Sequence, residues 1–198
     1  MTTVYDEAAI DALTKTATSA SCADQLYLLR LYGLYPKRAD ADVVVSLLLS
    51  AMPQVDPPTH YTSCALLIPI HLVRTPDVQA CLAIGDMVQS GRFASMWDLV
   101  HHHSALFERH AGVNFVERMR AYIAAQIGAT FSTIRLANLK VLLDTDDCRA
   151  VCERQGWKVA QGDLVEVGPG FIRKTTTESL MAKSHVTYNQ VLKMQEII

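Results

Sequence analysis

The run His101-His102-His103 is the most obvious candidate for metal chemistry in the sequence. Successive side chains of a helix point about 100° apart, so three neighbouring imidazoles cannot converge on one ion. Converging ligands lie three or four positions apart, and here only Asp98 has that spacing from His101 or His102. No His-Glu-x-x-His pattern completes a coordination shell. The histidines are therefore predicted to lie on a solvated helix face without a metal.

Two further groups carry side chains that are common in metal and redox sites. Cys148 and Cys152 are four residues apart, which is not the two-residue spacing of a zinc or redox pair. Packing in a core is predicted for both thiols. The acids Asp144, Asp146 and Asp147 lack the glycine and the terminal glutamate of a calcium loop. They suit the start of a helix, where the macrodipole favours negative charge.

Signatures of nucleotide binding and of activated nucleophiles are missing from the sequence. It contains no G-x-x-x-x-G-K loop, no G-x-G-x-x-G after a strand and no G-x-S-x-G elbow. Gly168-Pro169-Gly170 is typical of a turn. We therefore expect no catalytic residues and no cofactor, and a function that depends on binding other proteins.

The composition favours a compact chain with protein partners. Half of the 198 residues are apolar, 19% are charged, and the formal net charge is -2, which gives no general attraction to nucleic acid or acidic membranes. The most apolar stretches, 43–51 and 65–73, are shorter than the ~20 residues that cross a bilayer. Residues 1–9 carry acids where a secretory signal has cations. With five irregularly spaced cysteines, these features predict a cytoplasmic protein that does not bind membranes.

Helix start and stop signals recur along the N-terminal two-thirds of the chain. Asp40 or Asp42 can cap one helix, and Thr75 followed by Pro76 is a typical start of another. Pro69 is expected to bend or end the segment between them. The pattern predicts a helical-repeat (HEAT/ARM-like) domain of stacked helix pairs over residues 1–112.

Residues 113–170 are predicted to form a winged-helix domain. Asn114 caps a regular helix, and Ser132 or Thr133 then caps a short second helix. A third helix over residues 146–155 ends at Gly156. The apolar positions predicted for the second helix are Ile134, Leu136, Leu139 and Leu142.

Two short strands follow the third helix, one at 157–159 and one at 164–167, joined by a tight turn. Three helices and then a β-hairpin is the element order of a winged helix. Trp157 and Leu139 are predicted to lie in its core. The hairpin is marginal alone, so its second strand is expected to offer an open edge to a neighbouring subunit.

The charge of the predicted winged helix argues against reading DNA. Residues 113–170 contain seven bases and seven acids, and the helix in the recognition position, 146–155, has a net charge of -1. A DNA reader needs uncompensated cations there. The winged-helix domain is therefore predicted to bind proteins and not DNA.

A C-terminal helical tail is predicted over residues 171–198. Two capping boxes, Thr175 with Glu178 and Thr187 with Gln190, mark helix starts. A helix that begins at Thr187 has an apolar stripe along one side. Together with the second strand, this stripe supplies the predicted partner-binding residues: Leu164, Val165, Glu166, Val167, Tyr188, Val191, Leu192 and Ile198.

An ordered set of packing and turn residues resembles a known family. The set comprises Leu31-Tyr32-x-x-Tyr35-Pro36, Ala83-Ile84-Gly85-Asp86, Phe93, Met96-Trp97, Tyr122-Ile123, Ile127-Gly128 and Gly156-Trp157. Over roughly residues 80–167 their order and spacing are similar to those of PCI-related scaffold subunits of large eukaryotic assemblies. Within that group, the chain most closely resembles the subunit k family of eukaryotic translation initiation factor 3.

This resemblance implies a mainly α fold, with helical repeats, a winged helix with a small β-hairpin, and a helical tail. It also implies a non-catalytic scaffold among the other subunits of the factor, especially subunit l, acting with the small ribosomal subunit as part of the assembly. Two alternatives stay open. One is a sister PCI-type subunit of the proteasome lid or signalosome, and the other is a winged-helix protein that binds nucleic acid.

Overall fold

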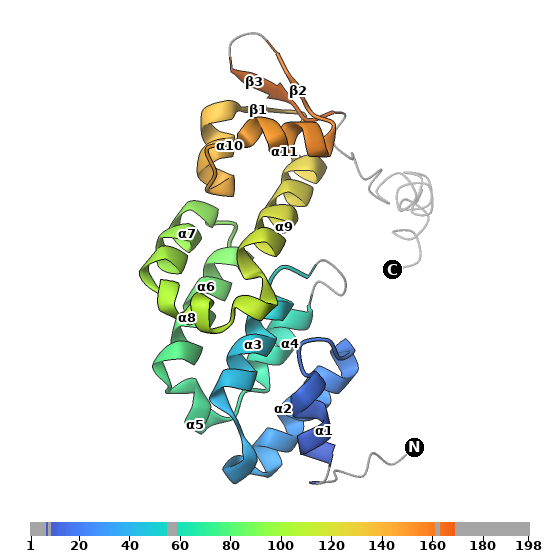
Figure 1. Ribbon diagram of the computed structural model, residues 1–198, viewed down its shortest axis with the longest axis vertical. Coiled ribbons are helices and arrows are strands. Elements are labelled where there is room, and N and C mark those ends of the chain that lie inside the picture. Colours follow the sequence, from blue (N-terminus) through green and yellow to red (C-terminus); the bar gives the residue numbers. More distant parts are fainter. Residues whose placement is uncertain (1–6, 8, 55–58, 161–162, 169–198) are drawn as a thin grey trace, which may run out of the picture.

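The computed structural model describes residues 7, 9–54, 59–160 and 163–168. Helices stack along the long axis of the molecule, and a small sheet lies at one end (Figure 1). This arrangement confirms the predicted mainly α fold. The helices are α1 (Ala9–Thr16), α2 (Cys22–Leu34), α3 (Ala41–Ala51), α4 (His60–Leu66), α5 (Ile70–Val73), α6 (Pro76–Gln89), α7 (Phe93–His102), α8 (Ser104–Arg109), α9 (Phe115–Thr130), α10 (Leu136–Leu143) and α11 (Cys148–Gln155), with 3-10 turns η1 (Pro36–Arg38) and η2 (Ala111–Val113).

Helix starts follow the predicted positions, although their caps differ in detail. Asp40 accepts a hydrogen bond from the N–H of Asp42 at 2.9 Å and so caps α3. Thr75 precedes Pro76 at the start of α6, but its hydroxyl donates to the carbonyl of Leu72 instead. Asn114 has a left-handed backbone (φ 51°), and its side chain makes no cap hydrogen bond to α9. Asn114 therefore occupies the N-cap position of α9 as expected, but without the capping hydrogen bond.

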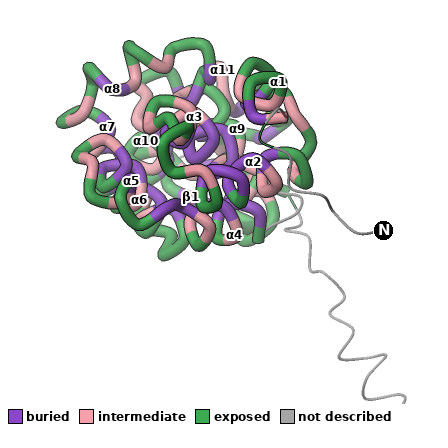
Figure 2. The backbone as a smooth tube through the Cα atoms, turned by 90° about the horizontal axis from the view of Figure 1, so that it is seen from below, coloured by how far each residue is buried: buried purple, intermediate pink, exposed green. Residues whose placement is uncertain are grey.

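The centre of the N-terminal part is α3, which packs against α4 and α6. Its run of apolar residues is almost fully buried, and Figure 2 shows buried backbone at the centre of the cross-section with exposed residues around the rim. The fully buried members are Val44, Val45, Leu47, Leu48 and Leu49. An α-helix that is apolar on most sides must be surrounded by others, and this determines the layered stack. In the described part of the chain, no helix is long and apolar enough to cross a membrane.

The C-terminal part has the element order of a winged helix, with one strand that the sequence pattern did not predict. Strand β1 (Thr133–Arg135) follows α9, and β2 (Lys158–Val159) and β3 (Leu164–Glu166) follow α11. Ser132 or Thr133 was expected to cap a helix containing Ile134. Instead, Ile134 is buried between exposed Thr133 and Arg135, the alternation of a strand. The second helix starts two or three residues later than expected, at Leu136.

The sheet has the order β1-β3-β2, so β3 is its central strand. Val165 is opposite Ile134 of β1 and opposite Val159 of β2. The expectation that strand 164–167 offers an open edge is therefore wrong. A third strand, β1, distant in sequence, occupies that edge.

Trp157 and Leu139 lie in the core, as predicted: Leu139 is fully buried and Trp157 is 8% exposed. The repeat part and the winged helix share this apolar core. Helix α7 packs against α10, and the indole N–H of Trp97 donates to the carbonyl of Leu142 at 2.8 Å. Helix α9 also contacts α3, because Arg118 donates to the carbonyl of Ser50. The domain boundary between residues 112 and 113 stays a prediction.

Candidate protein-interaction site

The four predicted contact residues of β3 and its end differ in how accessible they are. Val165 is fully buried, Leu164 and Val167 are half-buried, and Glu166 is exposed. Most side chains of β3 therefore pack within the domain and are not available to a partner. Its backbone is also hydrogen-bonded within the sheet: the N–H of Val167 donates to the carbonyl of Ser132, and the carbonyl of Leu164 accepts from the N–H of Ala160.

The outer edge of β2 has the open backbone that was expected of β3. Lys158 and Val159, which we call the wing edge, are exposed, Val159 by 45%. The Ala160 N–H donates to the Leu164 carbonyl at 2.7 Å, which makes 160 and 164 a hydrogen-bonded pair. Such pairs alternate with non-hydrogen-bonded ones, so the N–H and C=O of Val159 point away from β3. This edge can pair with a strand of another protein.

The predicted tail contacts, Tyr188, Val191, Leu192 and Ile198, lie outside the described residues. Their role stays a prediction.

The histidine run contributes to the joint between the two parts of the molecule. His101 Nε2 lies 2.9 Å from a carboxylate oxygen of Asp144, at the end of α10. Helical spacing along the sequence pointed to Asp98 instead, because Asp144 is 43 residues away from His101. His102 and His103 contact each other edge to face, with ring centroids 4.9 Å apart. Among the described residues, no group of three or more His, Cys, Asp or Glu side chains is placed to hold a metal.

Arg120 of α9 binds the same end of α10. Its guanidinium donates to the carbonyl of Leu143 at 3.0 Å and to that of Asp144 at 2.7 Å. It also lies 5.8 Å from the ring centroid of Trp97, within range of a cation–π interaction. Asp144 has a left-handed backbone (φ 50°), so α10 ends there with carbonyls that need donors. Arg120 supplies them and couples α7, α9 and α10.

Cys148 and Cys152 are buried on one side of α11, as predicted, and both are free thiols. Burial raises the pKa of both thiols. A raised pKa keeps a thiol protonated at neutral pH, whereas a reactive cysteine needs a lowered one. Both residues therefore act in packing.

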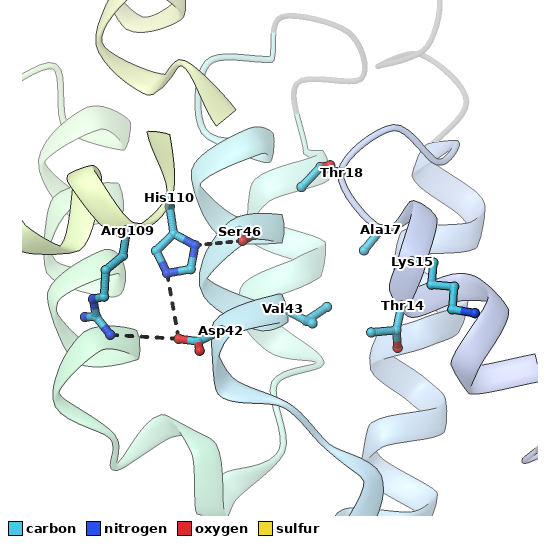
Figure 3. Close-up of a pocket in the computed structure, with 9 residues that line it drawn as sticks. All are labelled: Thr14, Lys15, Ala17, Thr18, Asp42, Val43, Ser46, Arg109 and His110. Atoms are coloured by element: carbon cyan, nitrogen blue, oxygen red, sulfur yellow. Dashed lines mark hydrogen bonds and ion pairs between the residues drawn. The ribbon is translucent and has the colours of Figure 1, made fainter. Parts of the chain in front are cut away.

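A pocket of about 440 Å³ lies between α1, α3 and the end of α8 (Figure 3). Ser46 Oγ lies 2.8 Å from Nδ1 of His110, and an oxygen of Asp42 lies 3.8 Å from Nε2 of the same ring. Arg109 forms an ion pair with Asp77 at 2.7 Å and lies 4.0 Å from Asp42. Sequence reasoning missed this group, because its members come from distant helices.

Serine, histidine and aspartate are also the side chains of a hydrolytic triad, but the geometry of this group differs from that of a catalytic triad. The Asp42–His110 distance is too long for a hydrogen bond. Ser46 lies inside α3, where backbone N–H groups are hydrogen-bonded within the helix and cannot form an oxyanion hole. The arrangement is suited to tying α3 to the chain after α8, not to activating a nucleophile.

The sequence model of the CSN8/PSMD8/EIF3K family matches residues 38–176 of this chain. The match begins at the end of η1, after the first helix pair, and includes the rest of the repeat part and the whole described winged helix. It therefore covers the wing edge but not the predicted contact residues of the tail.

Two insect relatives carry the same name. The chain is 26% identical over 145 residues to "Eukaryotic translation initiation factor 3 subunit K" of Drosophila grimshawi, covering 72% of this chain and 64% of that protein. It is 28% identical over 136 residues to the protein of the same name from Bombyx mori, covering 67% of this chain and 61% of the relative. The matches thus span somewhat less than two thirds of these relatives' length.

Proposed function

The chain belongs to the CSN8/PSMD8/EIF3K family, and from that membership we propose that it is a non-catalytic scaffold subunit of eukaryotic translation initiation factor 3. The observation that carries this choice within the family is the shared name of the relatives, initiation factor subunit K. The subunit works in the cytoplasm and helps to assemble the initiation complex on the small ribosomal subunit.

Its contacts are made through protein surfaces. The wing edge offers unpaired backbone to a strand of a neighbouring subunit, and the C-terminal residues Tyr188, Val191, Leu192 and Ile198 offer an apolar stripe. Subunit l is the expected neighbour. The winged helix does not favour nucleic acid, because helix α11 is close to neutral and Arg120 is occupied by the end of α10.

A sister subunit of the proteasome lid or signalosome is the second candidate, because the family model includes those branches by name. Affinity purification of the tagged full chain from cells of its own organism separates the two. The proposal requires initiation factor subunits among the partners, together with co-sedimentation with small ribosomal subunits. Recovery of proteasome or deubiquitinase subunits in their place would support the sister function.

The tail is tested by a truncation. A helix of 11 residues is too short to persist alone in water, so it must dock on its own domain or on other subunits. We expect deletion of residues 188–198 to leave the chain folded by circular dichroism but to reduce its recovery in the purified assembly by about tenfold or more. A truncated chain that unfolds would assign the stripe to its own core. Normal recovery of a folded truncated chain would refute the tail's role.

A further inference from the structure

A groove of about 610 Å³ lies between the end of α2 and the link from α4 to α5. Three large apolar side chains border it in the open: Leu34 is 56% exposed, Leu66 81% and Ile70 75%. They are half of the large apolar side chains that the described residues leave exposed. Scattered apolar side chains on a surface are ordinary, but several gathered on one concave surface mark an interaction site.

Two prolines create the concavity. Pro69 has no N–H to donate, so α4 ends at Leu66 and a new short helix, α5, begins at Ile70. On the other side, Pro36 begins η1 directly after α2. At these breaks Leu34, Leu66 and Ile70 are left exposed, whereas Ile68, between α4 and α5, is buried. The floor of the groove is therefore apolar, formed by residues such as Leu29 and Ile68.

The polar border of the groove carries the positive charge of Arg30. Arg30 and His71 line it, and no acidic residue does. Within the described part of the chain, neither of these two side chains has an ion-pair partner. An apolar floor with an unbalanced basic border is complementary to an apolar segment with acidic flanks.

Two occupants from the same protein fit this border poorly. The tail, residues 171–198, has four bases and two acids, and would bring more positive charge to the groove. A second copy joined through the same groove would share one two-fold interface, which brings the border with Arg30 of one chain against the same border of the other. Like charges at such an interface cost binding energy.

We propose that this groove docks an amphipathic helix of another protein, with apolar residues at positions i, i+3 or i+4 and i+7 and with Asp or Glu beside them. The spacing places its apolar side chains on one face, which enters the groove among Leu34, Leu66 and Ile70. Its acids lie beside Arg30. The groove is at the end of the molecule opposite the sheet, so a partner there leaves the wing edge free (Figure 1). The inference does not depend on the proposed function.

The test places a photo-crosslinking benzophenone amino acid at position 66 of the full chain, in cells of its own organism, and identifies the captured peptide by mass spectrometry. Position 141, where Val141 is also exposed but lies in α10, is the matched control. The expected product at position 66, and not at 141, is a segment of another protein with apolar residues at helical spacing and acidic flanks. Capture of residues 169–198, of a second copy, of a segment without that pattern, or of no protein would overturn the proposal.

The captured segment, made as a synthetic peptide, then measures the contribution of each part of the groove. Leu66→Asp and Arg30→Glu should each weaken its binding to the full chain by about tenfold or more, and Val141→Asp should not change it. All three positions are exposed, so circular dichroism should show folded variants. Equal binding by Arg30→Glu and the unaltered chain would overturn the predicted acidic character of the partner.

Discussion

Two glycines inside helices have opposite surroundings. A Cβ added to Gly85 of α6 would lie 1.8 Å from the hydroxyl oxygen of Tyr61 and 2.1 Å from its ring carbon Cζ. Tyr61 is 5% exposed, so its ring has little room to move. At Gly128 of α9 the nearest atom to an added Cβ is a ring carbon of Trp157 at 3.9 Å, an ordinary contact. One position needs glycine for packing and the other does not.

The same substitution should therefore have opposite effects at these two sites. Gly128→Ala should stabilise the protein by about 0.5 to 1 kcal/mol, because alanine loses less backbone entropy in a helix. Gly85→Ala should destabilise it by about 1 to 3 kcal/mol, because the buried ring must be displaced. Chemical unfolding of both variants measures the difference. A stable Gly85→Ala variant would show that Tyr61 can move aside.

His60 predicts how stability depends on pH. Its Nε2 lies 2.6 Å from the amide oxygen of Gln25, whose own amide N–H donates to the carbonyl of Ala17. Burial lowers the pKa of His60 from its usual 6.5. Below pH 6.5 the unfolded chain therefore binds the proton more readily than the folded one, and stability falls as the pH falls.

The variant His60→Asn keeps a donor for Gln25 and removes the titration. Unfolding free energies measured between pH 7.5 and 5 should fall less steeply for this variant than for the unaltered chain. Parallel slopes would mean that His60 does not carry this part of the pH dependence.

At the scale of elements, the sheet determines which backbone can be offered to a partner. Because β3 is bonded to β1 and β2, only the outer strands have open edges. The hydrogen-bonded pairs of β1 and β3 alternate from 132 with 167 to 136 with 163, which places Val165 in a bonded pair with Ile134. Val159 of β2 has its N–H directed outward. The same substitution at Val159 and at Val165 can therefore distinguish an effect on assembly from an effect on folding.

Proline at these two positions should give different results. Val165→Pro removes a bond of the central strand and should cost about 3 kcal/mol or more, seen as a lower melting temperature. Val159→Pro removes only an outward N–H, so we expect a folded chain that is recovered poorly with the assembly. Val159→Ala, which keeps the N–H, is the control for the lost side chain. Normal recovery of a folded Val159→Pro variant would exclude strand pairing at the wing edge.

For the whole molecule, the joint of α7, α9 and α10 makes the repeat part and the winged helix one body. The core is continuous across it, and Arg120 and Trp97 satisfy carbonyls at the end of α10. We therefore expect the two parts to unfold together. A single body of this kind holds its wing edge and its α2–α5 groove at a constant separation.

Arg120→Met tests the joint, because it keeps the length of the side chain and removes its donors. Two carbonyls, of Leu143 and Asp144, then lack a partner, at a cost of about 1 to 3 kcal/mol. Glu117→Gln is the control: it breaks the exposed ion pair of Arg120 with Glu117 and should change stability by less than about 1 kcal/mol. Calorimetry should show one transition in all three proteins. Two transitions in the unaltered chain would contradict a single body.

Signals in the sequence that act over a few residues predicted most of the elements correctly. Asp40 caps α3, Pro69 separates α4 from α5, and Gly156 ends α11 with a left-handed backbone. A cap, a missing N–H or a positive φ acts within one turn of the chain, so it is visible in sequence. Burial of Leu139 and Trp157 followed for a similar reason, from apolar spacing and turn position.

Contacts between distant residues depended on the tertiary structure alone. Residues 133–135 form a strand because β3, thirty residues later in the chain, pairs with them, and local spacing had favoured a helix. The same pairing places β3 at the centre of the sheet and moves the open edge to β2. His101 meets Asp144, and Leu34 meets the α4–α5 link, only after the helices have packed. Spacing along one helix or strand shows which side chains share a face. The packing of the elements determines which residues that face contacts.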